Sequence, residues 1–324
     1  MKVNDFVKVH SKVKHIDFMI SLGPDCRPNI NIQCNGFRYF SAPLDSVGTR
    51  SLKTTLHLYE SKFVDCFERY EILYDNQTTT NGFWVEDIVN NIYTVHYFKK
   101  NMSIEESYRQ FKEMMGRRAK RLDDLLKSAK KIVLAAERLE TKDEMIWFLK
   151  EFSNLYPNLD IELINIRNDT MMDFDEINEE RIIDEKKLSY TEYFFNDTRK
   201  CMVVPEGNIE LWSKVLLQYE NENLSSLKKA WKEMKNKYPH LVLYGTDRKV
   251  ARVANWLPNI GVSVDLVAEN IDDISIDRDS CIMLCVDDKK AIENENISYL
   301  KRRLSDRGYQ NVLSCDNFLR IKSL

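Results

Sequence analysis

Short apolar runs alternate with amphipathic stretches along much of the chain. Three runs have the length and composition of buried strands: residues 16–22 (IDFMISL), 130–136 (KKIVLAA) and 159–166 (LDIELINI). Between the second and third runs, residues 141–155 carry apolar side chains at helical spacing, and Thr141 and Glu144 match a capping box at the start. A strand, a helix and a strand with short connections predict a βαβ unit and therefore parallel strands.

A long amphipathic helix is predicted to follow Ser103. Ser103 and Glu106 have the spacing of a second capping box, and apolar residues then recur every three or four positions through Leu125. Composition and spacing predict the remaining elements of this half: a helix at residues 50–72, a polar loop at 74–82 and a strand at 91–98. Residues 168–206 are polar and irregular, and they predict no defined element.

The residues after Pro239 form a second alternating pattern. The predicted elements are strand, helix, strand, strand, helix and strand: HLVLYG, DRKVARVANWL, GVSVDLVAE, CIMLCVDD, NISYLKRRLSDRG and NVLSC. This order is typical of a small Rossmann-like domain with a parallel sheet. Helical stretches between about residues 208 and 236 connect the two halves. We therefore expect an α/β protein with two domains, residues 1–206 and 207–324.

Length and composition agree with two packed domains. The chain has 324 residues, of which 43% are hydrophobic. Charged residues of both signs are interleaved and the formal net charge is −3, so composition gives no electrostatic support for binding nucleic acid or a membrane surface. The sequence contains no run of about 18 apolar residues, so no membrane-spanning helix is predicted. Residues 1–23 show no secretory signal.

The cysteines indicate a reducing compartment. There are seven, an odd number, and they are scattered without a CxxC pair. Reduced thiols in a cytoplasm are therefore expected. Cys281 and Cys285 lie in an apolar run without a neighbouring histidine, so no metal site is predicted.

Cys26 lies between the first predicted strand and a short helix. In SLGPDCRPN, residues 21–29, Pro28 is allowed in the first helical turn, and Gly36 would supply a left-handed residue past the helix end. The positive end of that helix and the adjacent Arg27 would lower the pKa of the thiol and favour the nucleophilic thiolate. The same backbone N–H groups would bind an oxyanion. The alternative is a structural cysteine in a tight turn.

A thiol nucleophile needs a base, and two histidines are candidates. His96 lies among strand-forming hydrophobic residues, where the alternative role is that of a structural imidazole in the core. His57 lies in a predicted helix, where a surface or capping role also fits. Asp45, in SAPLDSV, either orients an imidazole or caps a turn.

Several of these segments together resemble one protein family. SLGPDC, GFRYFSAPLDSV, the strand that carries His96 and the basic helix GRRAKRL are similar to the bacterial family labelled papain-like cysteine peptidases, a domain of unknown function, DUF1796. The family pattern is SLG-x-x-C, then S-x-P-F-D-W, a histidine and an R-R-x-x-R helix. The resemblance covers about residues 15–170. In place of F-D-W this chain has L-D-S, and no glutamine precedes Cys26 at the papain-like spacing.

The resemblance implies roles for particular residues. Cys26 would be the nucleophile, His96 the base and Asp45 a polar residue of the site. The predicted substrate-binding residues are three arginines that would bind an anionic group: Arg38, Arg117 and Arg118. For the two on the basic helix, the alternative is a solvated face with local ion pairs. The family's association with surface-polysaccharide genes implies a glycan or its acyl groups as substrate.

The second domain is not predicted to bind a dinucleotide. Gly245 holds the first glycine position of a G-x-G-x-x-G turn, but Asp247 and Val250 occupy the other two. Glu269 is placed like a ribose-binding acid, yet it also suits a strand end. We therefore predict no cofactor and a scaffold or interaction role for this domain.

The expected function is a cytoplasmic cysteine hydrolase or acyltransferase of bacterial polysaccharide metabolism, acting on a small-molecule, glycan or acyl substrate. Two alternatives remain open. One is an α/β esterase or transferase of the SGNH type, in which Cys26 only lines the site. The other is a non-catalytic accessory protein that binds a glycan or a nucleotide-sugar enzyme. The oligomeric state is not predicted.

Overall fold

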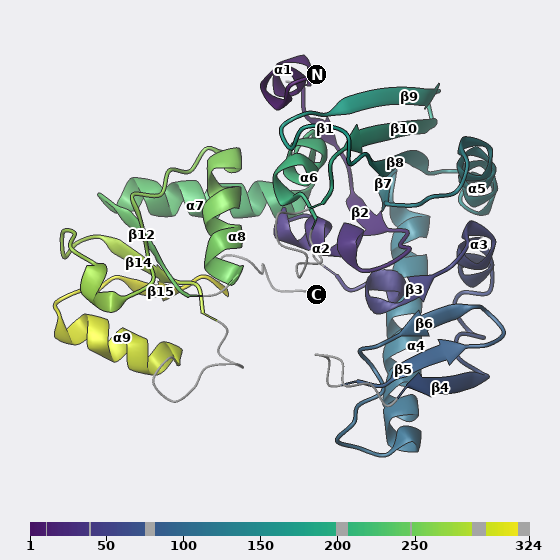
Figure 1. Ribbon diagram of the computed structural model, residues 1–324, viewed down its shortest axis with the longest axis horizontal. Coiled ribbons are helices and arrows are strands. Elements are labelled where there is room, and N and C mark those ends of the chain that lie inside the picture. The colour runs from purple at the N-terminus through teal and green to yellow at the C-terminus, as the bar shows by residue number, and fades with distance from the viewer. Residues whose placement is uncertain are drawn as a thin grey trace. The chain divides into compact units, whose positions relative to one another are not determined.

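The computed structural model describes residues 1–10, 12–38, 40–74, 82–198, 207–246, 248–286 and 296–316. The chain divides into two compact units (Figure 1). The first comprises Met1–Gln33 and Phe40–Tyr219, and the second comprises Cys34–Tyr39 and Glu220–Leu324. The expected boundary at residue 206 falls at the edge of a stretch outside the described residues, and the compact units divide after Tyr219.

A five-stranded sheet forms the centre of the first unit. Its strand order is β2 (Phe18–Ser21), β7 (Lys131–Ala136), β8 (Asp160–Asn168), β10 (Leu188–Phe195) and β9 (Asn178–Asp184). The first four strands are parallel and β9 is antiparallel at the edge. The predicted βαβ unit is confirmed, with α5 (Lys142–Leu155) between β7 and β8 and a complete capping box at Thr141.

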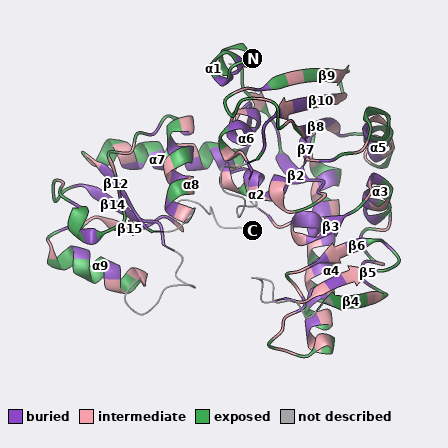
Figure 2. Cartoon of the chain, viewed as in Figure 1, coloured by how far each residue is buried: buried purple, intermediate pink, exposed green. Residues whose placement is uncertain are grey.

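Helices cover both faces of this sheet, which explains why β7 is an almost continuous apolar run (Figure 2). Figure 1 shows α3 (Leu52–Glu60) and α5 on one side, where Tyr59 and Phe152 meet edge to face at 4.9 Å. The helices α1 (Val3–Val9) and α6 (Ile209–Leu216) cover the other side. There Trp212 of α6 packs against Phe195, with ring centroids 6.3 Å apart. The first unit is thus an α/β structure with helices on both faces of its sheet, in agreement with the predicted α/β class and βαβ unit.

The β9–β10 pair lies in the stretch for which no element was predicted. The edge strand β9 is exposed or half-buried at almost every position, so its side chains show no apolar alternation. The inner strand β10 is buried but carries Glu192, whose carboxylate is paired with Arg167 at 2.5 Å. Tertiary pairing, rather than local hydrophobicity, therefore creates this part of the sheet.

A small antiparallel sheet flanks the large one. Its order is β3 (Gly48–Thr49), β6 (Ile92–Thr94), β5 (Trp84–Asp87) and β4 (Tyr70–Tyr74). The helix expected over residues 50–72 was predicted too long, because α3 ends at Glu60 and the chain then turns into β4. Lys62, Phe63 and Phe67 adopt positive φ angles in that turn. Buried Asp87 accepts the Phe67 N–H at 2.6 Å and holds the turn in place.

Two helices follow the local signals closely. The helix α4 (Ile104–Ser128) begins after Ser103, whose hydroxyl accepts the Glu106 N–H at 3.1 Å. The Glu106 carboxylate binds Arg109 rather than completing the predicted capping box. The helix α2 (Arg27–Cys34) follows β2 directly, and Gly36 has the left-handed φ of +79° expected past its end. Short elements complete the unit: η1 (Pro43–Ser46) and the paired strands β1 (Lys14–His15) and β11 (Tyr219–Glu220).

The second unit is built on a four-stranded parallel sheet, in agreement with the predicted Rossmann-like pattern. Its order is β13 (Leu266–Ala268), β12 (Leu241–Tyr244), β14 (Cys281–Leu284) and β15 (Val312–Ser314). The helical elements that accompany it in the described part of this unit are α7 (Glu222–Lys237), α8 (Arg248–Trp256), η2 (Leu257–Ile260), η3 (Ile271–Asp273) and α9 (Ile297–Asp306). Over the described ranges of both units, no helix is long and apolar enough to cross a membrane.

Candidate active site around Cys26

Cys26 lies at the junction of β2 and α2, as predicted. The strand ends at Ser21, and the carbonyl of Cys26 accepts the Ile30 N–H at 2.9 Å, which makes Cys26 the residue that begins the helix. The residue is half-buried. Because β2 is parallel to β7, the thiol lies beyond the carboxyl edge of the sheet, where α/β proteins commonly bind ligands.

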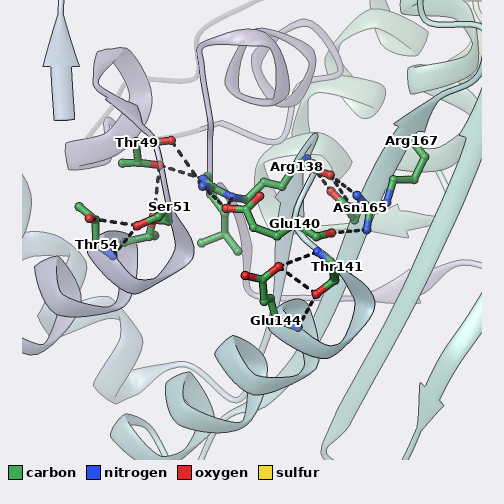
Figure 3. Close-up of polar contacts among 11 residues, drawn as sticks. Thr49, Ser51, Thr54, Arg138, Glu140, Thr141, Glu144, Asn165 and Arg167 are labelled. Carbon is green, nitrogen blue, oxygen red and sulfur yellow. Dashed lines mark hydrogen bonds and ion pairs between the residues drawn. The ribbon is translucent and has the colours of Figure 1, made fainter. Parts of the chain in front are cut away.

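A buried arginine holds the turn that carries Cys26 (Figure 3). Arg138 follows β7 and is only 1% exposed. Its Nη1 donates to the Leu22 carbonyl and to the Thr49 hydroxyl, each at 2.9 Å. Its Nε and Nη2 donate to Glu140 Oε1 at 2.9 and 2.6 Å. The guanidinium therefore joins the ends of β2 and β7 to the small sheet at β3.

Polar side chains of β8 fix the main chain around Arg138 in turn. Asn165 accepts the Arg138 N–H at 2.8 Å and donates to its carbonyl at 3.1 Å. Arg167 donates to the carbonyls of Arg138 and Glu140 at 2.6 and 2.7 Å. Figure 3 shows these contacts running from β8 across the loop after β7. The loop that follows β7 is therefore held rigidly next to Cys26.

A charged cluster lies next to the thiol. Arg27 Nη1 donates to Glu137 Oε1 at 2.7 Å and to Asp197 Oδ2 at 3.0 Å. Glu137 follows β7 and Asp197 follows β10, so both acids also come from the carboxyl edge of the sheet. Sequence reasoning missed both acids and Arg138. The only local signal was a charged residue directly after a buried strand, which is common at strand ends.

The surroundings of Cys26 keep the thiol protonated, contrary to the predicted thiolate. Partial burial and the charge of Asp25 raise its pKa, and Glu137 adds to this effect, while its own backbone N–H and Arg27 oppose it. The helix start also has fewer free donors than expected for an oxyanion site. Asp25 Oδ1 accepts the Arg27 N–H at 2.8 Å, and Pro28 has no N–H.

Both acids of the cluster bind protons more tightly than usual. Burial raises the pKa of Glu137 to about 8; the charge of Arg27 opposes this shift, and the charges of Asp197 and Asp25 add to it. Burial also raises the pKa of Asp197, although donors from Asn208, Arg27 and Trp212 counteract it. Burial outweighs the charge of a guanidinium that Glu137 shares with Asp197, so most of the Glu137 carboxyl is protonated at neutral pH.

Tyr93 of β6 also lies near the thiol. Burial raises the pKa of its phenol, and the charges of Asp25 and Cys26 raise it further. The Tyr93 ring lies directly against Gly48, where an added Cβ would be 2.2 Å from Cζ. On its other side it stacks on Trp84, with centroids 5.1 Å apart.

The structure does not join a histidine to Cys26 within its described residues. His96 lies beyond the end of β6, and its backbone N–H donates to the Thr94 hydroxyl at 3.3 Å. Partial burial and the charge of Lys99 lower the pKa of His96, which favours a neutral imidazole. His57 lies on α3, where Nε2 is 2.7 Å from Asp65 Oδ2.

Asp45 acts as a capping residue in the structure. Its buried carboxylate accepts the Ala42 N–H at 2.9 Å at the start of η1. Its carbonyl accepts from Asn29 Nδ2 at 3.1 Å, which links η1 to the first turn of α2. Asp45 is therefore near the helix that carries Cys26, where its carboxylate caps η1.

The three predicted substrate-binding arginines lie in different places. Arg118 Nη1 donates to the Tyr97 hydroxyl at 2.6 Å, next to His96 along the chain. Arg117 is exposed on α4 and lines a shallow surface with Lys120 and Arg121. Arg38 belongs to the second unit.

The turn after β12 is closely packed at Gly245. An added Cβ at Gly245 would lie 2.7 Å from the Cys285 carbonyl, and Lys249 Nζ binds the Val286 carbonyl and Asp316, each at 2.8 Å. Asp247 lies outside the described residues. Nor do the described parts of the chain contain a group of three or more histidine, cysteine, aspartate or glutamate side chains placed to hold a metal ion.

Comparison with known proteins connects this site to one family. The family model described as "Putative papain-like cysteine peptidase (DUF1796)" matches residues 17–178, which is half of the chain. The matched segment contains Cys26, His96 and Glu137 and ends before Asp197. No curated protein and no solved structure shows significant similarity to the chain. The chain belongs to the DUF1796 family, whose description is that of a papain-like cysteine peptidase.

Proposed function

We propose that this protein is a thiol-dependent hydrolase or acyltransferase in which Cys26 attacks an acyl carbonyl. One observation carries the proposal: a half-exposed thiol lies at the carboxyl edge of a parallel sheet, beside an arginine anchored by two acids. Loops at this edge present reactive groups on a rigid scaffold in many α/β enzymes. The description of the family also supports thiol chemistry.

The reaction would proceed through a thioester. A bond forms between Cys26 Sγ and the acyl carbon as the thiol loses its proton, and the amine or alcohol of the substrate leaves with a proton. Water or a second acceptor then attacks the thioester and releases the thiol. Because the pKa of Cys26 is raised, the resting thiol is protonated, and the first step requires a proton acceptor.

The substrate class that we propose is an acyl group carried by a glycan, in the cytoplasm of a bacterium. The family resemblance supports the glycan. The compartment is supported by the cysteines of the described residues, Cys26 among them, none of which is joined in a disulfide bond. Arg27 Nη1 already donates to Glu137 and Asp197, so an anionic group of the substrate would have to displace one of these carboxylates in order to bind Nη1.

A covalent trap tests the proposal. The protein is incubated with a chromogenic acetate ester, an O-acetylated oligosaccharide and a peptide amide, and intact mass is measured during turnover. We expect an acyl adduct on Cys26, and a loss of turnover of about 100-fold or more in Cys26→Ala. Cys34→Ala, another half-buried thiol, is the matched control and should retain activity.

The alternatives predict different results. Full activity in Cys26→Ala would indicate an esterase or transferase in which the thiol only lines the site. Lack of turnover and of any adduct with the whole substrate panel would support the non-catalytic binding protein.

A further inference from the structure

Glu137 and Asp197 use their carboxylate oxygens very differently. Asp197 Oδ1 accepts from the Asn208 N–H at 2.6 Å and from Trp212 Nε1 at 3.1 Å, and Oδ2 accepts from Arg27. Glu137 accepts from Arg27 through Oε1, whereas its Oε2 is buried without a hydrogen-bond partner. A buried carboxylate oxygen without a donor is costly unless it carries a proton or exchanges one.

The backbone places Glu137 beside the turn that carries Cys26. The Glu137 N–H donates to the Gly23 carbonyl at 3.3 Å, directly beyond the parallel pair formed by Ser21 and Ala135. The charge of Glu137 acts on the Cys26 thiol, as do the charges of Asp25 and Arg27 from the same turn. Asp197 faces Glu137 from the end of β10.

We propose that Glu137 is the group that takes up the proton of the Cys26 thiol. Asp197 is then a positioning residue, which holds Arg27 and through it the Glu137 carboxylate. This inference rests on the proposed thiol chemistry, and it assigns to an acid the role that the family resemblance implied for His96. The unpartnered oxygen of Glu137 is the feature that separates the two acids.

Every proton transferred in the reaction is accounted for by Cys26, Glu137, the substrate and water. As the Sγ–C bond forms, the thiol proton passes to Glu137 Oε2. Glu137 then returns this proton to the leaving nitrogen or oxygen as its bond to the acyl carbon breaks. In the second half, Glu137 takes a proton from water, the oxygen bonds to the acyl carbon, and the proton passes to the departing sulfur. Only the ionised carboxylate can accept the thiol proton, and with a pKa of about 8 the ionised fraction of Glu137 grows between about pH 6 and 9, so the rate of this step should rise over that range.

Alkylation of Cys26 tests the electrostatic part without any substrate. Iodoacetamide modification is followed by mass spectrometry from pH 5.5 to 10.5 for the wild type and Glu137→Gln. Below about pH 7 the wild-type carboxyl is protonated, so the rates should agree. Above pH 8 the wild-type carboxylate opposes the thiolate, so Glu137→Gln should react about three- to tenfold faster. Equal rates over the whole range would overturn the proposed proximity.

Turnover tests the proton transfer. Glu137→Gln should lose about 100- to 10,000-fold in turnover although its thiol is more reactive, and Glu137→Asp should recover part of the loss. A purely structural role would not produce this opposite change in alkylation and turnover. His57→Gln is the control, since its partner is Asp65. Retained turnover in Glu137→Gln with loss in His96→Gln would assign the role to His96. Retained turnover in Cys26→Ala would instead refute the proposed function.

Discussion

Thr49 and Arg138 are joined by a buried hydrogen bond of 2.9 Å between the threonine hydroxyl and Nη1, across 89 positions of sequence. The bond attaches the small antiparallel sheet to the carboxyl edge of the large parallel sheet. Arg138 simultaneously binds the Leu22 carbonyl, four residues before Cys26. The position of the candidate nucleophile therefore depends on a residue of another strand.

Arg138→Met should strongly destabilise the first unit. The substitution leaves Glu140 and the Leu22 and Thr49 carbonyls without their donor in a buried site. We expect the free energy of unfolding in urea to fall by about 3–5 kcal/mol. Arg109→Met is the matched control, because that arginine pairs with Glu106 on the exposed face of α4 and should contribute about 0–1 kcal/mol. Equal effects would contradict the role of Arg138.

Stability should decline with pH because of Glu137. Its folded pKa of about 8 exceeds the ordinary value of 4.5, so between about pH 5 and 8 the folded state binds more protons than the unfolded state. The free energy of unfolding therefore falls as pH rises through this window, by at most about 1.4 kcal/mol per pH unit for one proton. Asp197, whose pKa is also raised, acts with the same sign.

Urea titrations at several pH values between 5 and 8 measure this slope. Glu137→Gln cannot ionise, so its slope should be smaller than that of the wild type. Identical slopes for the two proteins would mean that Glu137 titrates in the folded state as it does in the unfolded chain.

Gly48→Ala should displace the Tyr93 ring and destabilise the first unit. The new methyl group would overlap the ring, with Cβ only 2.2 Å from Cζ. We expect a loss of about 1–3 kcal/mol in the free energy of unfolding, as for other overpacked sites. In a Tyr93→Ala background the same substitution should be tolerated. Additive effects of the two substitutions would show that they do not interact.

Gly36→Ala should destabilise the second unit. Gly36 has a φ of +79°, and an added Cβ would lie 3.0 Å from Leu227 Cδ1 and 3.3 Å from Trp256 Cζ2. The strained backbone costs about 1–2 kcal/mol. Gly116→Ala provides the opposite control, because this position lies within α4 with no atom within 4 Å. There alanine should stabilise by about 0.5–1 kcal/mol, and thermal unfolding of both variants measures the contrast.

Local signals were sufficient where an element depends on neighbouring residues. Ser103 and Thr141 start α4 and α5 as predicted, because a side chain can cap only the helix that follows it. The strands β7 and β8 were recognised because burial on both faces makes β7 an almost continuous apolar run and leaves β8 mostly apolar from Ile161 to Ile166. The end of α3 was missed because the turn after it, in which Lys62 and Phe63 have positive φ angles, is followed by a contact between Phe67 and the distant Asp87 of β5 that no local pattern reveals.

The sequence by itself determined the α/β class, the two-part organisation and the placement of Cys26 at the start of a helix, since each depends on hydrophobic periodicity or on a local turn. Only the tertiary structure decided which groups surround that sulfur. Glu137 and Asp197 reach Arg27 across 110 and 170 positions. Their charges and their burial exist only once the parallel strands are aligned, and for that reason the protonation of the thiol could not be inferred from the turn alone.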